Sequence, residues 1–159
     1  MPRFDTHSGL YGWDAPERRI KEVRKQCLIL TGISLILSLG CGLLPTGVAR
    51  HNWVGFAGTA ALVAVLLEIV AVGRFCSAKS QLDYRSFHSI HWMMDYAPLL
   101  HIMLMGVAFA AGIISCIQGF TGVMDILCLA GFLLSGAASL MLRKAYRTIP
   151  VYKMDETGY

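Results

Sequence analysis

Two ionisable side chains, Glu68 and His101, stand inside long apolar stretches of the sequence. Glu68 lies six residues before Arg74, and His101 lies four residues inside the apolar run that begins at Ala97. A charged carboxylate in the hydrocarbon of a membrane is costly, so it is normally paired, neutralised or hydrated. The similar depth of the two residues predicts that they meet. Such a pair either handles protons or cations or is a buried polar bridge that fixes helix register. The alternative is that Glu68 extends its side chain to the inner surface.

A second group of polar residues has the spacing of one helical face. His88, His91 and Asp95 stand at positions i, i+3 and i+7, and imidazole with carboxylate is a ligand set that zinc accepts. No second pair such as Glu-x-x-His is present in another apolar run, and only His101 lies at a depth suited to a haem ligand. The alternative is that these residues form the wet face of a helix, with Asp95 as an N-cap. We therefore predict no cofactor.

The five cysteines include no C-x-x-C motif, which argues against a thioredoxin-type centre or a zinc ribbon. Cys41 and Cys116 each stand near the outer end of an apolar run, where a disulfide between them is one prediction. The other is that they are small packing residues, which is the commoner role of cysteine in membranes. The sequence also contains no nucleophile elbow, phosphate-binding loop or paired catalytic carboxylates.

The composition identifies the setting of these residues. Of 159 residues 55% are hydrophobic and only 15% are charged, whereas soluble domains carry about 25% charged residues. A chain this short needs those charges as a solvated coat. The composition therefore excludes a disordered tail, a disulfide-stapled secreted module and an ordinary soluble enzyme, and it predicts a polytopic membrane protein.

Four apolar runs are long enough to cross about 30 Å of hydrocarbon as helices. The fold class that we predict is all-α integral membrane, a four-transmembrane-helix bundle that fills residues 27–142. The predicted spans cover residues 27–44, 53–73, 97–117 and 123–142. Glycine and alanine recur along each run, which favours close packing of the helices.

The lysines and arginines predict the orientation, because their excess marks the cytoplasmic side. Thirteen of the fourteen fall before the first span, between the second and third, or after the fourth, and only Arg50 falls in the other connections. Both termini are therefore expected inside a plasma or inner membrane, or an organelle inner membrane. No removable signal peptide or nucleic-acid-binding domain is indicated.

The segments outside the spans have distinct patterns. Residues 1–26 read as a cytoplasmic arm followed by a basic juxtamembrane helix, and residues 143–159 as an unstructured cytoplasmic tail. Residues 74–96 contain an apolar stripe that predicts an amphipathic interfacial helix before the third span. Ile90, Trp92, Met93 and Met94 make up that stripe, for which we expect contact with lipid headgroups or with the undersides of the spans.

A weak internal repeat relates the two halves of the chain. Residues 41–48 and 116–123 share Cys, Thr, Gly and Val at an offset of 75, and Gly55-Phe56 aligns within one residue with Gly131-Phe132. A 2+2 pseudo-repeat would place its axis along the membrane normal. Chance similarity between apolar segments is the alternative.

Three functions fit these observations, and no resemblance to a known family helps to choose. The leading hypothesis is a non-catalytic structural or accessory subunit, or a homo-oligomer, with the lipid bilayer and a membrane protein as its partners. The alternative is a small transporter or channel with an ion or proton path through Glu68 and His101. The third is a metal-dependent membrane enzyme that uses His88, His91 and Asp95.

Overall fold

The computed structural model describes residues 10–43, 52–79, 81–119 and 122–154, which form four helices and three short strands. The helices are α1 (Glu17–Leu43), α2 (Asn52–Ser77), α3 (Tyr84–Gln118) and α4 (Val123–Tyr146). Each of the four is long and apolar enough to cross a membrane. The chain is thus an all-helical bundle with the make-up of a multi-pass membrane protein, as its composition predicts.

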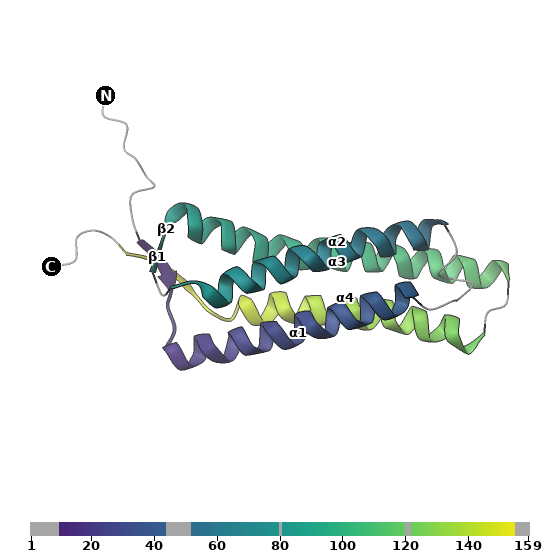
Figure 1. Cartoon of the computed structure of the whole chain (residues 1–159), viewed down its shortest axis with the longest axis horizontal. Helices are drawn as coiled ribbons and strands as arrows, with labels where there is room; N and C mark the ends of the chain where they lie inside the picture. The colour runs from purple at the N-terminus through teal and green to yellow at the C-terminus, as the bar shows by residue number, and fades with distance from the viewer. Residues whose placement is uncertain (1–9, 44–51, 80, 120–121, 155–159) are drawn as a thin grey trace, which may run out of the picture.

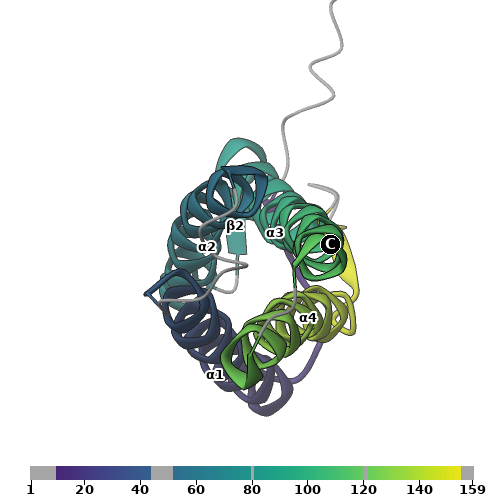
Figure 2. The ribbon, with the colours of Figure 1, turned by 90° about the vertical axis from the view of Figure 1, so that its right-hand side faces the viewer.

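The four helices lie side by side around one long axis (Figure 1). Seen along that axis, they follow chain order around a ring, so α1 packs against α2 and α4, and α3 packs against the same two helices (Figure 2). The contact between α1 and α2 is the least extensive of these four. We call the end that carries the strands the sheet end, and the end where α1 stops and α2 starts the loop end.

The helices extend beyond the predicted spans at the sheet end. α1 begins at Glu17, ten residues before the predicted span, because a charged segment can continue a helix once its residues pair along one face. Lys21 Nζ lies 2.8 Å from Glu17 Oε1, and Arg18 Nε lies 3.5 Å from Glu22 Oε1. Arg24 then ties α1 to the end of α2, since its Nη2 donates to the carbonyl oxygen of Ala78 at 2.7 Å.

The separate interfacial helix predicted before the third span is not seen, because residues 84–118 form one uninterrupted helix, α3. Pro98 lies inside it without ending it. The predicted stripe also divides between two environments: Ile90 and Met94 are buried in the bundle, Met93 is half-buried and Trp92 is 54% exposed. Burial of Ile90 and Met94 against the neighbouring helices explains why this segment continues the bundle instead of leaving it.

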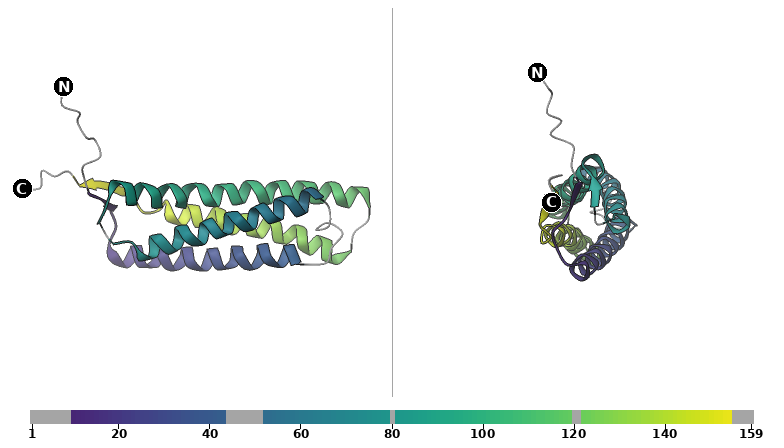
Figure 3. Two further views of the ribbon diagram at one scale, coloured as in Figure 1. Left: turned by 45° about the horizontal axis from the view of Figure 1, so that its top comes forward. Right: turned by 90° about the vertical axis from the view of Figure 1, so that its left-hand side faces the viewer.

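A small antiparallel sheet caps the bundle, with strand order β2-β1-β3 (Figure 3). β1 (Leu10–Trp13) comes from the predicted arm, β2 (Gln81–Asp83) from the connection before α3, and β3 (Val151–Met154) from the predicted unstructured tail. The tail is therefore structured as far as residue 154. The pairing of β1 with β3 also holds the two ends of the described chain at the sheet end (Figure 1).

Two apolar clusters fill the bundle. The sheet-end cluster is aromatic, with Trp13 edge-on to Phe75 at 5.1 Å between ring centroids and Phe75 edge-on to Tyr146 at 5.2 Å. The loop-end cluster contains smaller side chains: Cys41, Val54, Ala57, Ala61, Met105, Ala108, Cys128 and Phe132. The buried polar residues of the bundle lie mainly between these two clusters.

The internal repeat finds no support in the packing. Much of the repeated motif, at residues 44–48 and 120–121, lies outside the described residues. The aligned phenylalanines occupy unlike environments, since Phe56 is 69% exposed and Phe132 is 3% exposed.

Candidate functional site: a buried histidine between a glutamate and four serines

The structure brings Glu68 and His101 together in the middle of the bundle. His101 lies midway along α3, and its Nδ1 is 3.1 Å from Oε1 of Glu68 on the neighbouring α2. Both side chains are completely buried. A titratable pair is thus enclosed between helices that are long enough to cross a membrane, away from lipid and from bulk water.

Four serines complete the surroundings of the imidazole. Ser34 and Ser139 lie 3.2 and 2.9 Å from Nδ1. Ser38 and Ser135 lie 3.3 and 3.1 Å from Nε2. The two pairs are also linked within themselves, because Ser34 and Ser139 are 3.1 Å apart and Ser38 and Ser135 are 2.8 Å apart.

Helix periodicity explains this arrangement. Ser34 and Ser38 are four residues apart on α1, and Ser135 and Ser139 are four residues apart on α4, so each helix presents both hydroxyls on one face. Because α1 and α4 run in opposite directions, Ser38 and Ser135 both lie one turn nearer the loop end. Nε2 of His101 therefore faces the loop end, and Nδ1, with Glu68, faces the sheet end.

Two of the buried polar atoms that lack a hydrogen-bond partner belong to residues in or next to this network. Oε2 of Glu68 and Oγ1 of Thr31 have no hydrogen-bond partner among the described residues. Thr31 lies three residues before Ser34 on α1, and it is 5% exposed. Buried polar atoms are nearly always hydrogen-bonded, and an unsatisfied one destabilises a protein by about 1–3 kcal/mol.

A cavity of about 200 Å³ reaches the network from the loop end. It lies mainly between α1 and α2, the pair in least extensive contact, and Ser38 is part of its wall. Gly58 also lines it, and a Cβ added there would meet no atom within 4 Å. On the sheet-end side of the network, Phe75, Met94 and Leu142 are fully buried.

The second predicted group, His88, His91 and Asp95, is not gathered into a metal site. Nδ1 of His91 lies 3.0 Å from the Tyr146 hydroxyl, and the His88 ring stacks on Tyr84 at 5.4 Å. Within the described ranges, no three His, Cys, Asp or Glu side chains are placed to share a metal ion. The third residue, Asp95, forms ion pairs with two arginines instead.

Asp95 joins α3 to α4 through two arginines. Its carboxylate accepts hydrogen bonds from Arg143 at 3.0 and 3.3 Å and from Arg147 at 2.7 Å on each oxygen. The hydrogen bonds to Asp95, together with its negative charge, raise the pKa of the Arg147 guanidinium above its ordinary value. The N-cap of α3 is Asp83 instead, twelve residues earlier, where Oδ2 accepts a hydrogen bond from the Ser86 amide at 3.1 Å.

Cys41 lies beside Cys128 of α4. Its thiol donates to the Cys128 carbonyl oxygen at 3.6 Å, and the Cys128 thiol donates back to the Cys41 carbonyl oxygen at 3.7 Å. The disulfide between Cys41 and Cys116 stays a prediction.

Sequence reasoning found Glu68 and His101 but missed the serines. Each serine pair has a recognisable signal, a Ser-x-x-x-Ser spacing inside an apolar run. The spacing alone is ambiguous, because small residues also serve helix packing.

Comparison with protein-family models, with curated proteins and with solved structures finds no match to this chain. Its function therefore has to be inferred from its own residues.

Proposed function

We propose that this chain is a small membrane protein that moves protons, as a channel or a proton-coupled carrier, through the Glu68–His101 site. The observation that carries the proposal is the fully buried Glu68, which contacts His101 through one oxygen and leaves the other without a partner. A bridge that only fixed helix register would be expected to satisfy both oxygens, whereas ionisable groups that handle protons are typically found at such buried positions.

The imidazole supplies the chemistry. A neutral histidine accepts a proton at one ring nitrogen and releases one from the other. In the proposed step, Nε2 of His101 takes a proton that arrives from the cavity past Ser38, and the Nδ1 proton passes to Oε1 of Glu68. The glutamic acid so formed is neutral, which removes the cost of a buried charge.

The serines orient the ring for this transfer. A hydroxyl both donates and accepts, so Ser38 and Ser135 can either donate to a neutral Nε2 or accept from a protonated one. Ser34 and Ser139 have the same freedom at Nδ1. The network therefore accommodates every protonation state of His101 without a change in helix packing.

The cavity gives the site one open side. It reaches Ser38 from the loop end, and the sheet-end cluster separates Glu68 from the opposite end. Onward release then requires a rearrangement of Phe75, Met94 and Leu142, so we propose that this cluster is the gate. The excess of Lys and Arg at the sheet end supports a cytoplasmic position for the gate and for both termini, with the cavity facing outside.

The test is proton flux in vesicles reconstituted with the purified chain, followed by an internal pH-sensitive dye under an imposed potential. Glu68→Gln keeps the shape and the hydrogen bond to His101 but cannot carry the proton, so we expect flux to fall to the level of protein-free vesicles. A Glu68→Gln protein that is folded and conducts like the wild type would contradict the proposal.

A second variant tests the access path without altering the site. Gly58→Leu places a side chain in the cavity, and we expect it to reduce flux severalfold while the melting temperature is retained. The matched control is Gly106→Leu on α3, where a Cβ likewise meets no atom within 4 Å but which does not line this cavity. Equal flux in the two variants would argue against the cavity as the entrance.

The subunit role favoured by the sequence alone stays a prediction. It would gain support if the folded wild type carried no proton flux and a second membrane protein copurified with it in mild detergent.

A further inference from the structure

A second groove lies on the outer surface, between α2 and α3. It has a volume of about 540 Å³, and its walls are almost entirely apolar. Its lining includes Leu67 from α2 and, from α3, Ser89, Trp92, Met93, Tyr96 and Met103. The rings of Trp92 and Tyr96 pack together with 4.8 Å between their centroids.

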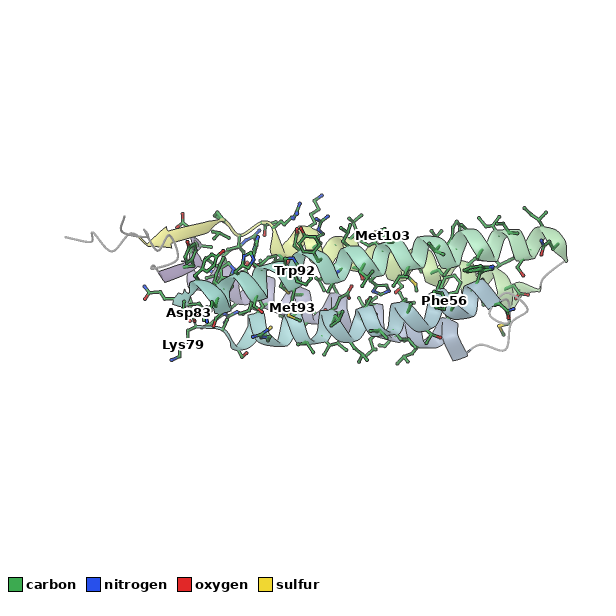
Figure 4. All side chains as sticks on the ribbon, turned by 90° about the horizontal axis from the view of Figure 1, so that it is seen from above. Phe56, Lys79, Asp83, Trp92, Met93 and Met103 are labelled. Atoms are coloured by element: carbon green, nitrogen blue, oxygen red, sulfur yellow. The ribbon has the colours of Figure 1, made fainter. Side chains whose placement is uncertain are left out.

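The groove is exposed to whatever surrounds the bundle. Trp92 and Met103 are 54% and 62% exposed, and Leu67 is 40% exposed. Figure 4 shows Trp92, Met93 and Met103 following α3 from the sheet end toward the middle of the bundle. From Ser89 to Met103 the groove spans ~21 Å at 1.5 Å per residue, comparable to the depth of one leaflet with its headgroup region, which is half of a bilayer about 40–45 Å thick.

One end of the groove carries a positive charge. Nη1 of Arg74 donates to Ser89 Oγ at 3.0 Å and contacts Met93 Sδ at 3.7 Å, and both of these residues line the groove. Arg74 is exposed, and no carboxylate pairs with it in the described part of the chain. Leu67 precedes Arg74 by seven residues, so the charge sits two turns from the apolar wall on the same face of α2.

We propose that this groove binds an anionic phospholipid, with the phosphate on Arg74 and Ser89 and an acyl chain along Leu67, Trp92 and Met103. The arrangement complements such a lipid in charge and in length. Tryptophan and tyrosine favour the headgroup level, and Trp92 and Tyr96 come just before the predicted span at residues 97–117. A guanidinium binds phosphate through two hydrogen bonds. The proposal does not depend on proton movement through His101.

Trp92 provides a local reporter for the test. Of the three tryptophans, Trp13 is 4% exposed, and Trp53 lies at the start of α2, at the loop end. Trp53→Phe therefore leaves Trp92 as the only exposed tryptophan. The full chain with this substitution is placed in nanodiscs, and its fluorescence is measured as brominated phosphatidylglycerol or brominated phosphatidylcholine replaces the unlabelled lipid.

We expect half-maximal quenching at an about fivefold lower fraction of the anionic lipid, because one basic residue near the surface gives roughly that preference. Arg74→Gln should abolish the preference while general quenching remains. Lys25→Gln, which removes an exposed charge from α1 at the same end but outside the groove, should leave the preference intact.

Two results would overturn the proposal. One is equal quenching by both lipids in the protein with Arg74 intact. The other is a Trp92 signal that neither lipid quenches, together with a dimeric mass in nanodiscs that Trp92→Ala converts to a monomer, because the groove would then be occupied by a second copy of the chain.

Discussion

At Gly131, α4 approaches α1 so closely that there is no room for a side chain. A Cβ built on Gly131 would collide with the Sγ atom of Cys41. Four residues along α4, Ser135 contacts both Ser38 and the main-chain oxygen of Ser34, the latter at 3.3 Å. Close approach at Gly131 therefore helps to bring the serines of α4 within reach of α1.

Replacement of Gly131 by alanine should destabilise the bundle by about 1–3 kcal/mol, the usual cost of overpacking. The measurement is the melting temperature in mild detergent. Gly32→Ala is the control, because its Cβ would meet no atom within 4 Å, and we expect no loss there.

The double variant Cys41→Ala, Gly131→Ala should recover much of the loss, since the colliding sulfur is gone. Additive effects of the two substitutions would show that the collision is not the cause.

The sequence predicts an individual site residue best where that residue type is rare among its neighbours in the chain. Glu68 and His101 stand out because ionisable groups are rare in apolar runs, and depth alone was enough to predict their contact. The serines do not stand out, because a hydroxyl in a span serves packing as well as hydrogen bonding. Asp95 was wrongly expected to cap a helix, since its partners Arg143 and Arg147 are about fifty residues away in the chain.

The first turn of α3 is held by its N-cap residue, Asp83. The Ser86 amide donates to Asp83. Hydrogen bonding from the Ser86 side chain, and then from this amide, lowers the pKa of the Asp83 carboxyl below its ordinary 3.8. A carboxyl whose pKa is lower in the folded state stabilises the fold above its unfolded pKa. That contribution is lost as the pH falls through the folded value.

Asp83→Ala should therefore raise amide hydrogen exchange in the first turn of α3 at pH 7. The difference from the wild type should shrink as the pH falls below about 3.8, the ordinary value, because both proteins then lack the charged cap. Exchange is measured by mass spectrometry, with allowance for the intrinsic pH dependence from an unfolded reference peptide. A difference that stays constant from pH 7 down to the acid limit would contradict this account.

The elements that the sequence missed are those defined by distant partners. Pro98 and Asp95 suggested a helix start, but the buried contacts of Ile90 and Met94 hold residues 84–96 in the same helix as the span. β1 and β3 are four residues long, and each is stable only because the other end of the chain lies beside it. A local sequence pattern cannot predict a pairing between segments that are so far apart in the chain.

For the molecule as a whole, its orientation in the membrane decides what the site can do. The spans are predictable because hydrocarbon thickness imposes their length. The orientation stays a prediction, which rests on the basic residues that gather at one end. The cavity and the proposed gate lie toward opposite ends of the bundle. If the proposed function holds, the protein would take up protons from outside in one orientation and from the cytoplasm in the other.

Cysteine labelling can determine the orientation with few changes to the chain. Cys27, Cys41 and Cys128 are buried, so only Cys76 and Cys116 need replacement by alanine. In that background Lys79→Cys reports on the sheet end and Gly122→Cys on the loop end, both at exposed positions. We expect a membrane-impermeant maleimide to label only Gly122→Cys in intact cells, and Lys79→Cys only after permeabilisation. The parent without a reporter cysteine should remain unlabelled in both conditions.

Labelling of Lys79→Cys in intact cells would show the opposite orientation. The cavity would then lie on the cytoplasmic side, and the proposed anionic lipid would lie in the outer leaflet, where such lipids are scarcer.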